Sequence, residues 1–524
     1  MGQSAKQGKA RSTIPSARVV GRVIRPRVQR FIFAGLITVL YLYCFPYFQG
    51  IRSANELPRI YLTMAMVDEG SFAIDSGVER WGKTADVSPH DGHLYSNKAP
   101  GSSMLAVPAY AFLKYTRKLT GEEPSLAEVT WVSRFFTGVL PTLLFMLLLW
   151  RFMHRFAPSL ETRRLLLAGY ALGTMAMTYS VLFISHQLAA VCIGTAYILT
   201  VWVTEEGLSL KRMWAVGLAA GCAPLVDYQA AFAGVPIAVF LIVKLLQQRR
   251  WQGVLYAAFG AIGPIALLLF YHSRAFGGAL KTGYGASKSF AHFHQQGFLG
   301  MDKLRMEAFS GSMISPENGL LLFCPMMLLA IPGWFLMAKR KNYWHMGVTL
   351  SIAAIYVGFV SSLIFWRGGW QLGPRYIVAM LPFMLVPIGV SLTWAESRWP
   401  ARGIAVGMIG VGIVIYSVST AFFPHFPEKF DNPFYELVLR LLWDGHAAYN
   451  VGYLVGLHGF VSLIPYFAAL GTLLVWIAYP AREHRKSALL GAGICFVVLA
   501  SYSLFHGGGA PADKAYQWIV TVMP

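Results

Sequence analysis

A lone lysine stands at the beginning of an apolar run, in the stretch HLYSNKAPG at residues 93–101. Lys98 lies two residues before Pro100, which restricts the backbone next to the ammonium group. An ammonium in this place can bind a phosphate through charge-assisted hydrogen bonds. It can also be an interfacial lysine whose alkyl stem lies along apolar surface while its charge reaches the lipid headgroups. On the residues alone, the second interpretation is the simpler one.

A carboxylate with a possible catalytic role occurs earlier, at the start of the stretch NELPRIYLTMAMVDE, residues 55–69, whose apolar residues repeat at helical spacing. Glu56 can act as a general base toward a hydroxyl within hydrogen-bonding reach. It can equally complement the dipole of its helix and pair with Arg59 three residues on. Rival carboxylates are Asp68 and Glu69, at the end of the same stretch, and Asp91 farther along the chain.

Further polar groups lie next to apolar runs downstream. Arg375 and Tyr376, in the sequence GPRY, open one such run, where a guanidinium can bind phosphate bidentately. Tyr284 follows another run in a glycine-rich segment. Asp227 lies at the outer end of an apolar run, and a carboxylate at membrane depth indicates a function or a buried partner. For His186, at the end of a further run, a structural hydrogen bond is the simpler interpretation.

The amino-acid composition indicates whether the protein lies in water or in a membrane. Of its 524 residues, 56% are hydrophobic and only 13% are charged, so a lipid environment is expected. The net charge of +20 does not point to nucleic acid, because the basic residues gather in short loops between apolar runs. The five cysteines lie far apart within apolar runs, which favours neither a disulfide framework nor a metal site.

The apolar runs predict an all-α integral membrane protein with about thirteen transmembrane helices in the region 31–505. The runs are 31–48, 131–150, 165–184, 187–203, 213–229, 230–247, 253–273, 317–338, 345–366, 376–395, 403–423, 460–479 and 487–505.

Loop charge predicts the orientation of these helices. Residues 1–30 carry basic charges and no acid, which predicts a cytoplasmic amino-terminal tail and an uncleaved first helix. If the run 101–115 lies along the membrane surface, every strongly basic short loop is cytoplasmic. The long loops then lie outside, together with the carboxyl-terminal tail, and the outer face is the working face. These outer segments are 49–130, 274–316, 424–459 and 506–524.

The motifs of the first outer loop occur in a recognisable order: NELPR, AMVDEGSFAID, HLYSNKAPG and VSRFFTGVLP. This order resembles the GT-C superfamily of membrane glycosyltransferases, and especially its family 39 branch, which contains protein O-mannosyltransferases and the lipid A aminoarabinose transferase. The matching features are Glu56, the Gly70–Phe72 turn, Lys98 with Pro100, and Arg134. The resemblance is clearest over residues 50–155.

The resemblance implies a GT-C-like bundle with juxtamembrane helices in its first outer loop. It also implies transfer of a sugar from a polyprenyl-phosphate-linked donor to a lipid, polysaccharide or protein acceptor on the outer face of the plasma membrane. With it, Lys98 and Arg375 become expected phosphate ligands and Glu56 the expected base. Arg59, Asp227, Tyr284 and Tyr376 are expected to support substrate binding. The sequence points to no particular cofactor, and a divalent cation is compatible with this chemistry.

Two departures from the family pattern bear on the base. The family's Asp-Glu pair reads Asn55-Glu56 here, and the acid that usually precedes the lysine is Asn97. Two alternatives to a transferase therefore stay open: a transporter or flippase of lipid-linked sugars, and a catalytically degenerate relative that binds the lipid. A transporter would be expected to carry broken helices and ionisable groups near mid-membrane, whereas the polar groups here gather at one end of the predicted helices.

Overall fold

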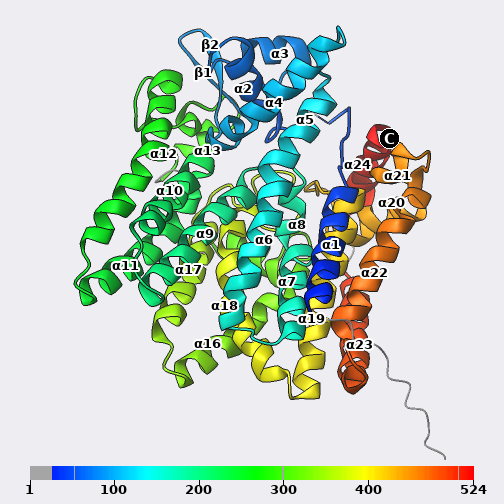
Figure 1. Cartoon of the computed structure of the whole chain (residues 1–524). Coiled ribbons are helices and arrows are strands. Elements are labelled where there is room, and N and C mark those ends of the chain that lie inside the picture. The colour runs from blue at the N-terminus through cyan, green and yellow to red at the C-terminus, as the bar shows by residue number, and fades with distance from the viewer. Residues whose placement is uncertain (1–25, 52, 298–299, 506) are drawn as a thin grey trace, which may run out of the picture.

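The computed structural model describes residues 26–524 except 52, 298–299 and 506, so the predicted basic tail up to residue 25 lies outside the described residues. Long helices form a bundle, and a small layer of shorter elements covers one end of it (Figure 1). In the described part of the chain, strands are limited to one two-stranded hairpin besides isolated bridges. The predicted all-α class is confirmed.

Within the described residues, nine helical segments are long and apolar enough to cross a membrane, so this is a multi-pass membrane protein. They coincide with nine of the thirteen predicted runs. The segments are Leu126–Arg155 (α5 to η2), His186–Glu205 (α9), Tyr228–Gln247 (η3, α11), Gln252–Phe276 (α12), Tyr343–Ser362 (α17), Arg375–Ala395 (η6, α18), Trp399–Phe422 (α19), Gly459–Ala478 (η8, α22) and Arg482–Tyr502 (η9, α23).

The other four predicted runs fall on shorter, interrupted or more polar helices, so a number of crossings above nine stays a prediction. One begins with two arginines in its first turns, and two are broken by turns, which lowers their continuous apolar length. These helices are α1 (Pro26–Tyr43), α7 and α8 (Leu160–Leu172 and Met175–Ser180), α10 (Leu210–Val226), and α15 to α16 (Leu320–Phe323 and Pro325–Lys339).

Burial separates the centre of the bundle from its edge. In the segments that contain α18 and α9, 89% and 78% of the apolar window is buried inside the protein, whereas the α23 segment has only 17% buried. Close helix contacts rely on glycine: a Cβ at Gly217 of α10 would stand 1.7 Å from the Ala257 carbonyl oxygen of α12. Small residues of this kind let membrane helices approach closely. The α10 helix ends at Val226, directly before Asp227.

The covering layer is built from the first outer loop, and α4 packs beside α2 in it (Figure 1). The helical spacing of residues 55–69 is confirmed as α2, and Gly70, which follows it, has a left-handed conformation. Asp91 and Gly92 both have positive φ, the geometry that an Asp-Gly pair gives to a two-residue hairpin turn. The elements of the layer are α2 (Leu57–Asp68), α3 (Asp75–Trp81), β1 (Val87–His90), β2 (His93–Ser96) and α4 (Gly101–Leu119). α4 contains the run 101–115 and is not among the nine membrane-crossing segments.

Shorter elements complete the described chain. On the side of the covering layer, α24 lies near the ends of α1 and α20 in Figure 1. These elements are η4 (Gly283–Ala286), α13 (Ala291–His294), α14 (Met306–Met313), η7 (Phe434–Leu439), α20 (Arg440–Trp443), α21 (Val451–Leu454) and α24 (Gly509–Val522).

Candidate functional site

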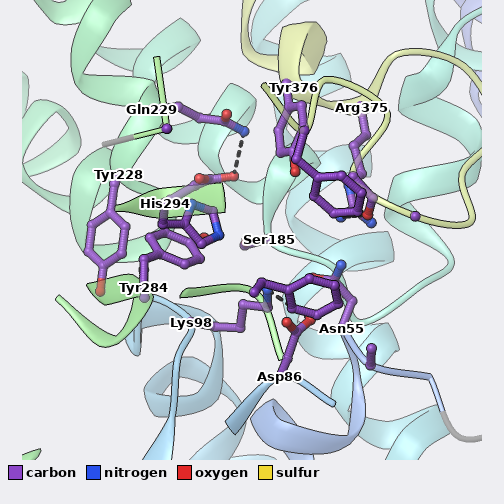
Figure 2. Close-up of a pocket in the computed structure, with 18 of the residues that line it drawn as sticks. Asn55, Asp86, Lys98, Ser185, Tyr228, Gln229, Tyr284, His294, Arg375 and Tyr376 are labelled. Atoms are coloured by element: carbon purple, nitrogen blue, oxygen red, sulfur yellow. Dashed lines mark hydrogen bonds and ion pairs between the residues drawn. The ribbon is translucent and has the colours of Figure 1, made fainter. Parts of the chain in front are cut away.

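A cavity of about 850 Å³ lies between the covering layer and the ends of the bundle helices. Figure 2 shows Asn55, Asp86 and Lys98 along one side, Gln229 and Tyr376 along the other, and Tyr284 and His294 between them. Six of the seven residues expected at the site line this cavity. They are Arg59, Lys98, Asp227, Tyr284, Arg375 and Tyr376.

The hairpin places a carboxylate against the lysine. Asp86 directly precedes β1 and Lys98 follows β2, and the antiparallel register that pairs Val87 with Ser96 brings both residues to the same end. Lys98 Nζ lies 2.8 Å from Asp86 Oδ2, and both side chains are buried. The Asn97 amide donates to Asp86 Oδ1 over 3.2 Å. Burial lowers the pKa of Lys98, although the Asp86 carboxylate opposes this.

Two guanidinium groups join the lysine. Arg59 donates to Asn55 Oδ1 over 2.9 Å and to Ser185 Oγ over 2.8 Å, which ties α2 to the start of α9. Arg375 donates to the Gly368 carbonyl and lies over the Tyr376 ring at 5.4 Å. The Nε atoms of both arginines are buried and make no hydrogen bond among the described residues. Both groups therefore have donor capacity left over.

The lining carries a surplus of positive charge. Its described cations are Arg59, Lys98, Lys281 and Arg375, and its described carboxylates are Asp86 and Asp227. A buried surplus of this kind favours an anionic ligand, because the low dielectric strengthens the attraction. The described residues contain no group of three or more histidine, cysteine, aspartate or glutamate side chains suited to a metal ion.

Asp227 has a buried partner, as its depth predicted. Asp227 Oδ2 lies 2.5 Å from His186 Nδ1, and the Gln229 amide contacts the same oxygen at 3.2 Å. His186 is the first residue of α9 and Asp227 follows the last residue of α10, so two packed helices bring the pair together. The sequence contained one signal for this contact, since both residues lie at the outer ends of neighbouring apolar runs.

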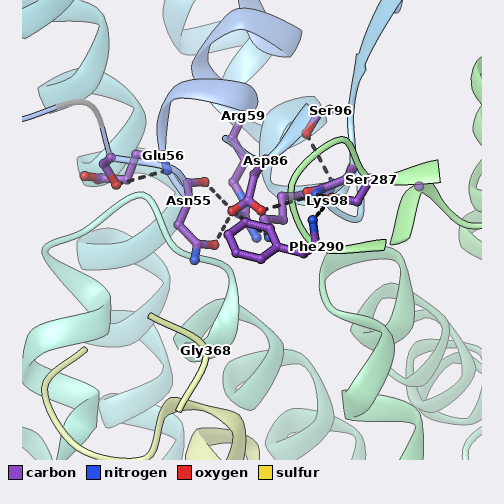
Figure 3. Close-up of polar contacts among 12 residues, drawn as sticks. Asn55, Glu56, Arg59, Asp86, Ser96, Lys98, Ser287, Phe290 and Gly368 are labelled. Carbon is purple, nitrogen blue, oxygen red and sulfur yellow. Dashed lines mark hydrogen bonds and ion pairs between the residues drawn. The ribbon is translucent and has the colours of Figure 1, made fainter. Parts of the chain in front are cut away.

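Glu56 is the one expected site residue that is not among the residues lining the cavity. Its two oxygens accept hydrogen bonds of 2.8 Å from Nε and Nη2 of Arg134, and the Phe183 N–H donates to it over 2.6 Å. Figure 3 shows Glu56 pointing away from Asn55 and Lys98. Burial alone would raise the pKa of Glu56, but the charge and hydrogen bonds of Arg134 outweigh it and leave this pKa lowered. This placement favours a structural role for Glu56.

The rival carboxylates of the first outer loop also lie outside the lining. Asp68 binds Lys114 at 2.7 Å, Glu69 accepts from Ser76, and Asp91 is exposed in the hairpin turn. The first-loop carboxylate of the cavity is Asp86, which sequence reasoning missed. The Asp-Gly turn between two short extended stretches was the signal that could have placed it beside the lysine.

Aromatic rings from distant segments close the cavity. The Tyr284 ring packs against the His294 ring at a tilt, with ring centroids 4.6 Å apart, and the Lys98 ammonium lies 5.5 Å from the Tyr284 ring. Trp518 of α24 meets Trp370 edge to face at 5.8 Å. The predicted outer tail therefore contains a helix that contributes to the cavity wall.

The comparisons with known proteins rest on structure. No family model matches the chain, and no curated protein matches its sequence significantly. Among solved structures, ArnT from Cupriavidus metallidurans in the apo state is similar with a TM-score of 0.47 and 15% identity, over 90% of this chain and 78% of that one. The same protein bound to undecaprenyl phosphate gives a TM-score of 0.46 and 14% identity, over 89% of this chain and 77% of that one.

Proposed function

We propose that this protein is a membrane glycosyltransferase, which moves a sugar from a polyprenyl-phosphate-linked donor to a lipid, glycan or protein acceptor. One observation carries the proposal: a buried cavity at the end of a membrane bundle gathers Lys98, Arg59 and Arg375 around one space. Each of the three cations is positioned by a contact within the site, so the site is preorganised before a ligand arrives. The order of motifs in the first outer loop supports the same function.

The chemistry of such a transfer accounts for these groups. When the bond between the sugar and its phosphate breaks, negative charge grows on the phosphate oxygens. Preorganised donors in a water-poor site stabilise that charge most strongly. Lys98 supplies a point charge, and Arg375 supplies a planar guanidinium whose Nε is unpartnered among the described residues.

The apolar part of the lining suits the hydrocarbon chain of the donor. Phe293 and Phe365 stack with centroids 4.7 Å apart, and Phe290 lies 5.5 Å from Phe365. All three rings line the same cavity as the cations. A prenyl chain would lie against these rings while its phosphate meets Lys98.

The proposed location is the plasma membrane, with the cavity on the outer face and the amino terminus in the cytoplasm. Short basic loops support this orientation, because Lys and Arg concentrate on the cytoplasmic side. Such loops join α11 to α12 near Arg249 and α16 to α17 near Arg340. In Figure 1 these connections lie at the end of the bundle away from the covering layer.

The test uses the full chain in nanodiscs of phosphatidylethanolamine and phosphatidylglycerol. Undecaprenyl phosphate and undecaprenol are compared as ligands, and a panel of undecaprenyl-phosphate-linked sugars is assayed for release of undecaprenyl phosphate in the presence of envelope lipids and polymers. We expect binding of the phosphate but not of the alcohol, and release from at least one donor. A transporter without transferase activity would bind the lipid and release nothing.

A matched pair of lysines sharpens this test. Lys98→Met removes a cation inside the cavity, whereas Lys114→Met removes one on α4 that also pairs with an aspartate but lies outside it. A hydrogen bond to a charged group contributes about 1.5–3 kcal/mol, so Lys98→Met should weaken undecaprenyl phosphate binding by roughly 10- to 100-fold. Lys114→Met should change it less than about twofold. Equal binding by both variants would contradict the proposed phosphate site.

A further inference from the structure

We propose that His186 is the general base that accepts the proton of the acceptor hydroxyl, and that Asp227 positions it. This inference rests on the proposed transferase function and identifies the group that replaces the missing first-loop acid. The observation that carries it is the buried contact of 2.5 Å between His186 Nδ1 and Asp227 Oδ2 on the cavity wall.

The hydrogen bonds around the pair fix the tautomer of the imidazole. The Gln229 amide nitrogen can only donate, and it lies 3.2 Å from Asp227 Oδ2 and 3.0 Å from His186 Nδ1. An ionised carboxylate oxygen can only accept, so Nδ1, which lies 2.5 Å from Asp227 Oδ2, carries the hydrogen and donates to it. The Gln229 nitrogen then donates to Asp227 Oδ2, and its approach to Nδ1 is a contact between two donors and not a hydrogen bond. The lone pair then resides on Nε2, where a base needs it.

The Nε2 atom of His186 is free for this task. It is buried and makes no hydrogen bond among the described residues, although the ring lines the cavity. Tyr179 and Tyr376 meet the ring edge to face at 5.7 and 6.0 Å, which holds its plane. An oriented histidine with one nitrogen on a carboxylate and the other unpartnered is the arrangement that proton abstraction requires.

The other ionisable groups of the cavity are less suited to the role. Asp86 uses one oxygen on Lys98 and the other on Asn97. The His294 ring packs at a tilt against Tyr284, and no carboxylate contacts it in the part of the chain that the structure describes. Among the described residues that line the cavity, only His186 combines an orienting carboxylate with an unpartnered nitrogen.

The reaction balances with groups that are already in the cavity. The acceptor oxygen gives its proton to His186 Nε2 and forms a bond to the anomeric carbon of the sugar. The bond from that carbon to the phosphate oxygen breaks, and its electron pair leaves with the polyprenyl phosphate beside Lys98. The imidazolium then returns its proton to solvent or to the departing phosphate, and Asp227 stabilises the cation in the interval.

The first experiment compares His186→Gln and Asp227→Asn with the wild type, using the donor that the wild type turns over. General base catalysis contributes about 10²- to 10⁴-fold, so His186→Gln should lower kcat at least about 100-fold. Asp227→Asn should also lower kcat, and neither variant should change the KM for donor or the binding of undecaprenyl phosphate more than about threefold. A structural role would move binding and kcat together.

The matched control is His345→Gln. His345 also pairs with an acid, with Nε2 2.9 Å from Glu205, and it is buried but remote from the cavity lining. Its replacement should leave kcat per folded molecule within about threefold of the wild type. Retention of wild-type kcat by His186→Gln would overturn the assignment, whereas a wild type that releases no polyprenyl phosphate from any donor would overturn the proposed function instead.

Chemical rescue separates a base from a space-filling ring. His186→Ala should regain turnover when imidazole is added, because the cavity of about 850 Å³ adjoins the vacated position. Pyrazole has nearly the same shape but is a much weaker base, and it should not restore turnover. No rescue by imidazole, or equal rescue by both compounds, would overturn the proposal.

Discussion

Replacement of Glu56 by glutamine should destabilise the protein while leaving its turnover largely intact. The Glu56 carboxylate and the Arg134 guanidinium form two parallel hydrogen bonds of 2.8 Å, and their side chains are only 5% and 6% exposed. This pair joins the start of α2 to the end of α5 (Leu126–Arg134), and Arg134 also donates to the Pro46 carbonyl over 2.9 Å. It therefore fastens the covering layer to the bundle behind the cavity wall.

The size of the effect follows from burial. Glutamine keeps the shape of Glu56 but leaves Arg134 as a buried cation without a counter-charge, and breaking such a pair costs about 3–5 kcal/mol. The control is Glu123→Gln, which removes a partner of Arg80 at 3.8 Å with side chains 68% and 42% exposed. Exposed pairs of this kind contribute less than about 1 kcal/mol.

The assay is the apparent melting temperature in detergent, together with turnover per folded molecule at a temperature below every transition. Glu56→Gln should melt well below the wild type, and Glu123→Gln close to it. A double replacement of Glu56 and Arg134 by methionine should recover much of the loss, because no unpaired charge remains. The reasoning is refuted if Glu56→Gln melts like the wild type but loses turnover, which would return the base to Glu56.

Three further changes test the surroundings of the cavity. Burial lowers the pKa of His425 to about 4, so the unfolded chain binds this proton at a higher pH than the folded protein does, and the melting temperature should fall as the pH drops from about 6.5 towards 4. His425→Asn should flatten this fall. An unchanged slope of melting temperature against pH would contradict the prediction. A Cβ at Gly283 would stand 2.6 Å from the backbone of the first outer loop, whereas a Cβ at Gly285 would meet open space. Gly283→Ala should therefore lower donor turnover, and Gly285→Ala should leave it unchanged. Equal effects of the two variants would contradict the close packing at Gly283. Trp518→Ala should weaken donor binding roughly two- to tenfold, since an aromatic contact contributes about 0.5–1.5 kcal/mol. Trp443, which is 90% exposed and outside the cavity lining, provides the control by substitution with alanine.

Most of the architecture could be predicted from hydropathy, because a helix that crosses lipid must satisfy its backbone internally and needs a long apolar run. The exceptions have physical causes. The run 165–184 is divided between α7 and α8 at Gly173 and Thr174, and the run 317–338 is interrupted at Cys324, after α15. Hydropathy averages over such breaks, because each involves only one or two residues within a long apolar run.

The candidate site was predictable where a charged residue stood at the end of an apolar run. Lys98, Arg375 and Asp227 all met that condition, and all line the cavity. Glu56 met it as well, but its partner Arg134 lies 78 residues away in sequence and could not be assigned from spacing. Asp86 was missed because its proximity to Lys98 depends on hairpin register, which can be assigned only once the Asp91-Gly92 turn between the two short strands is recognised.

The hairpin also has an evolutionary consequence. Asn97 donates to the same carboxylate that neutralises Lys98, so an acid at position 97 would face Asp86 and repel it. We therefore expect an acid at only one of positions 86 and 97 in related chains, with a neutral residue at the other. A sequence pattern that requires an acid directly before the lysine would therefore miss a chain that carries this acid on the other side of the hairpin, as Asp86 does here.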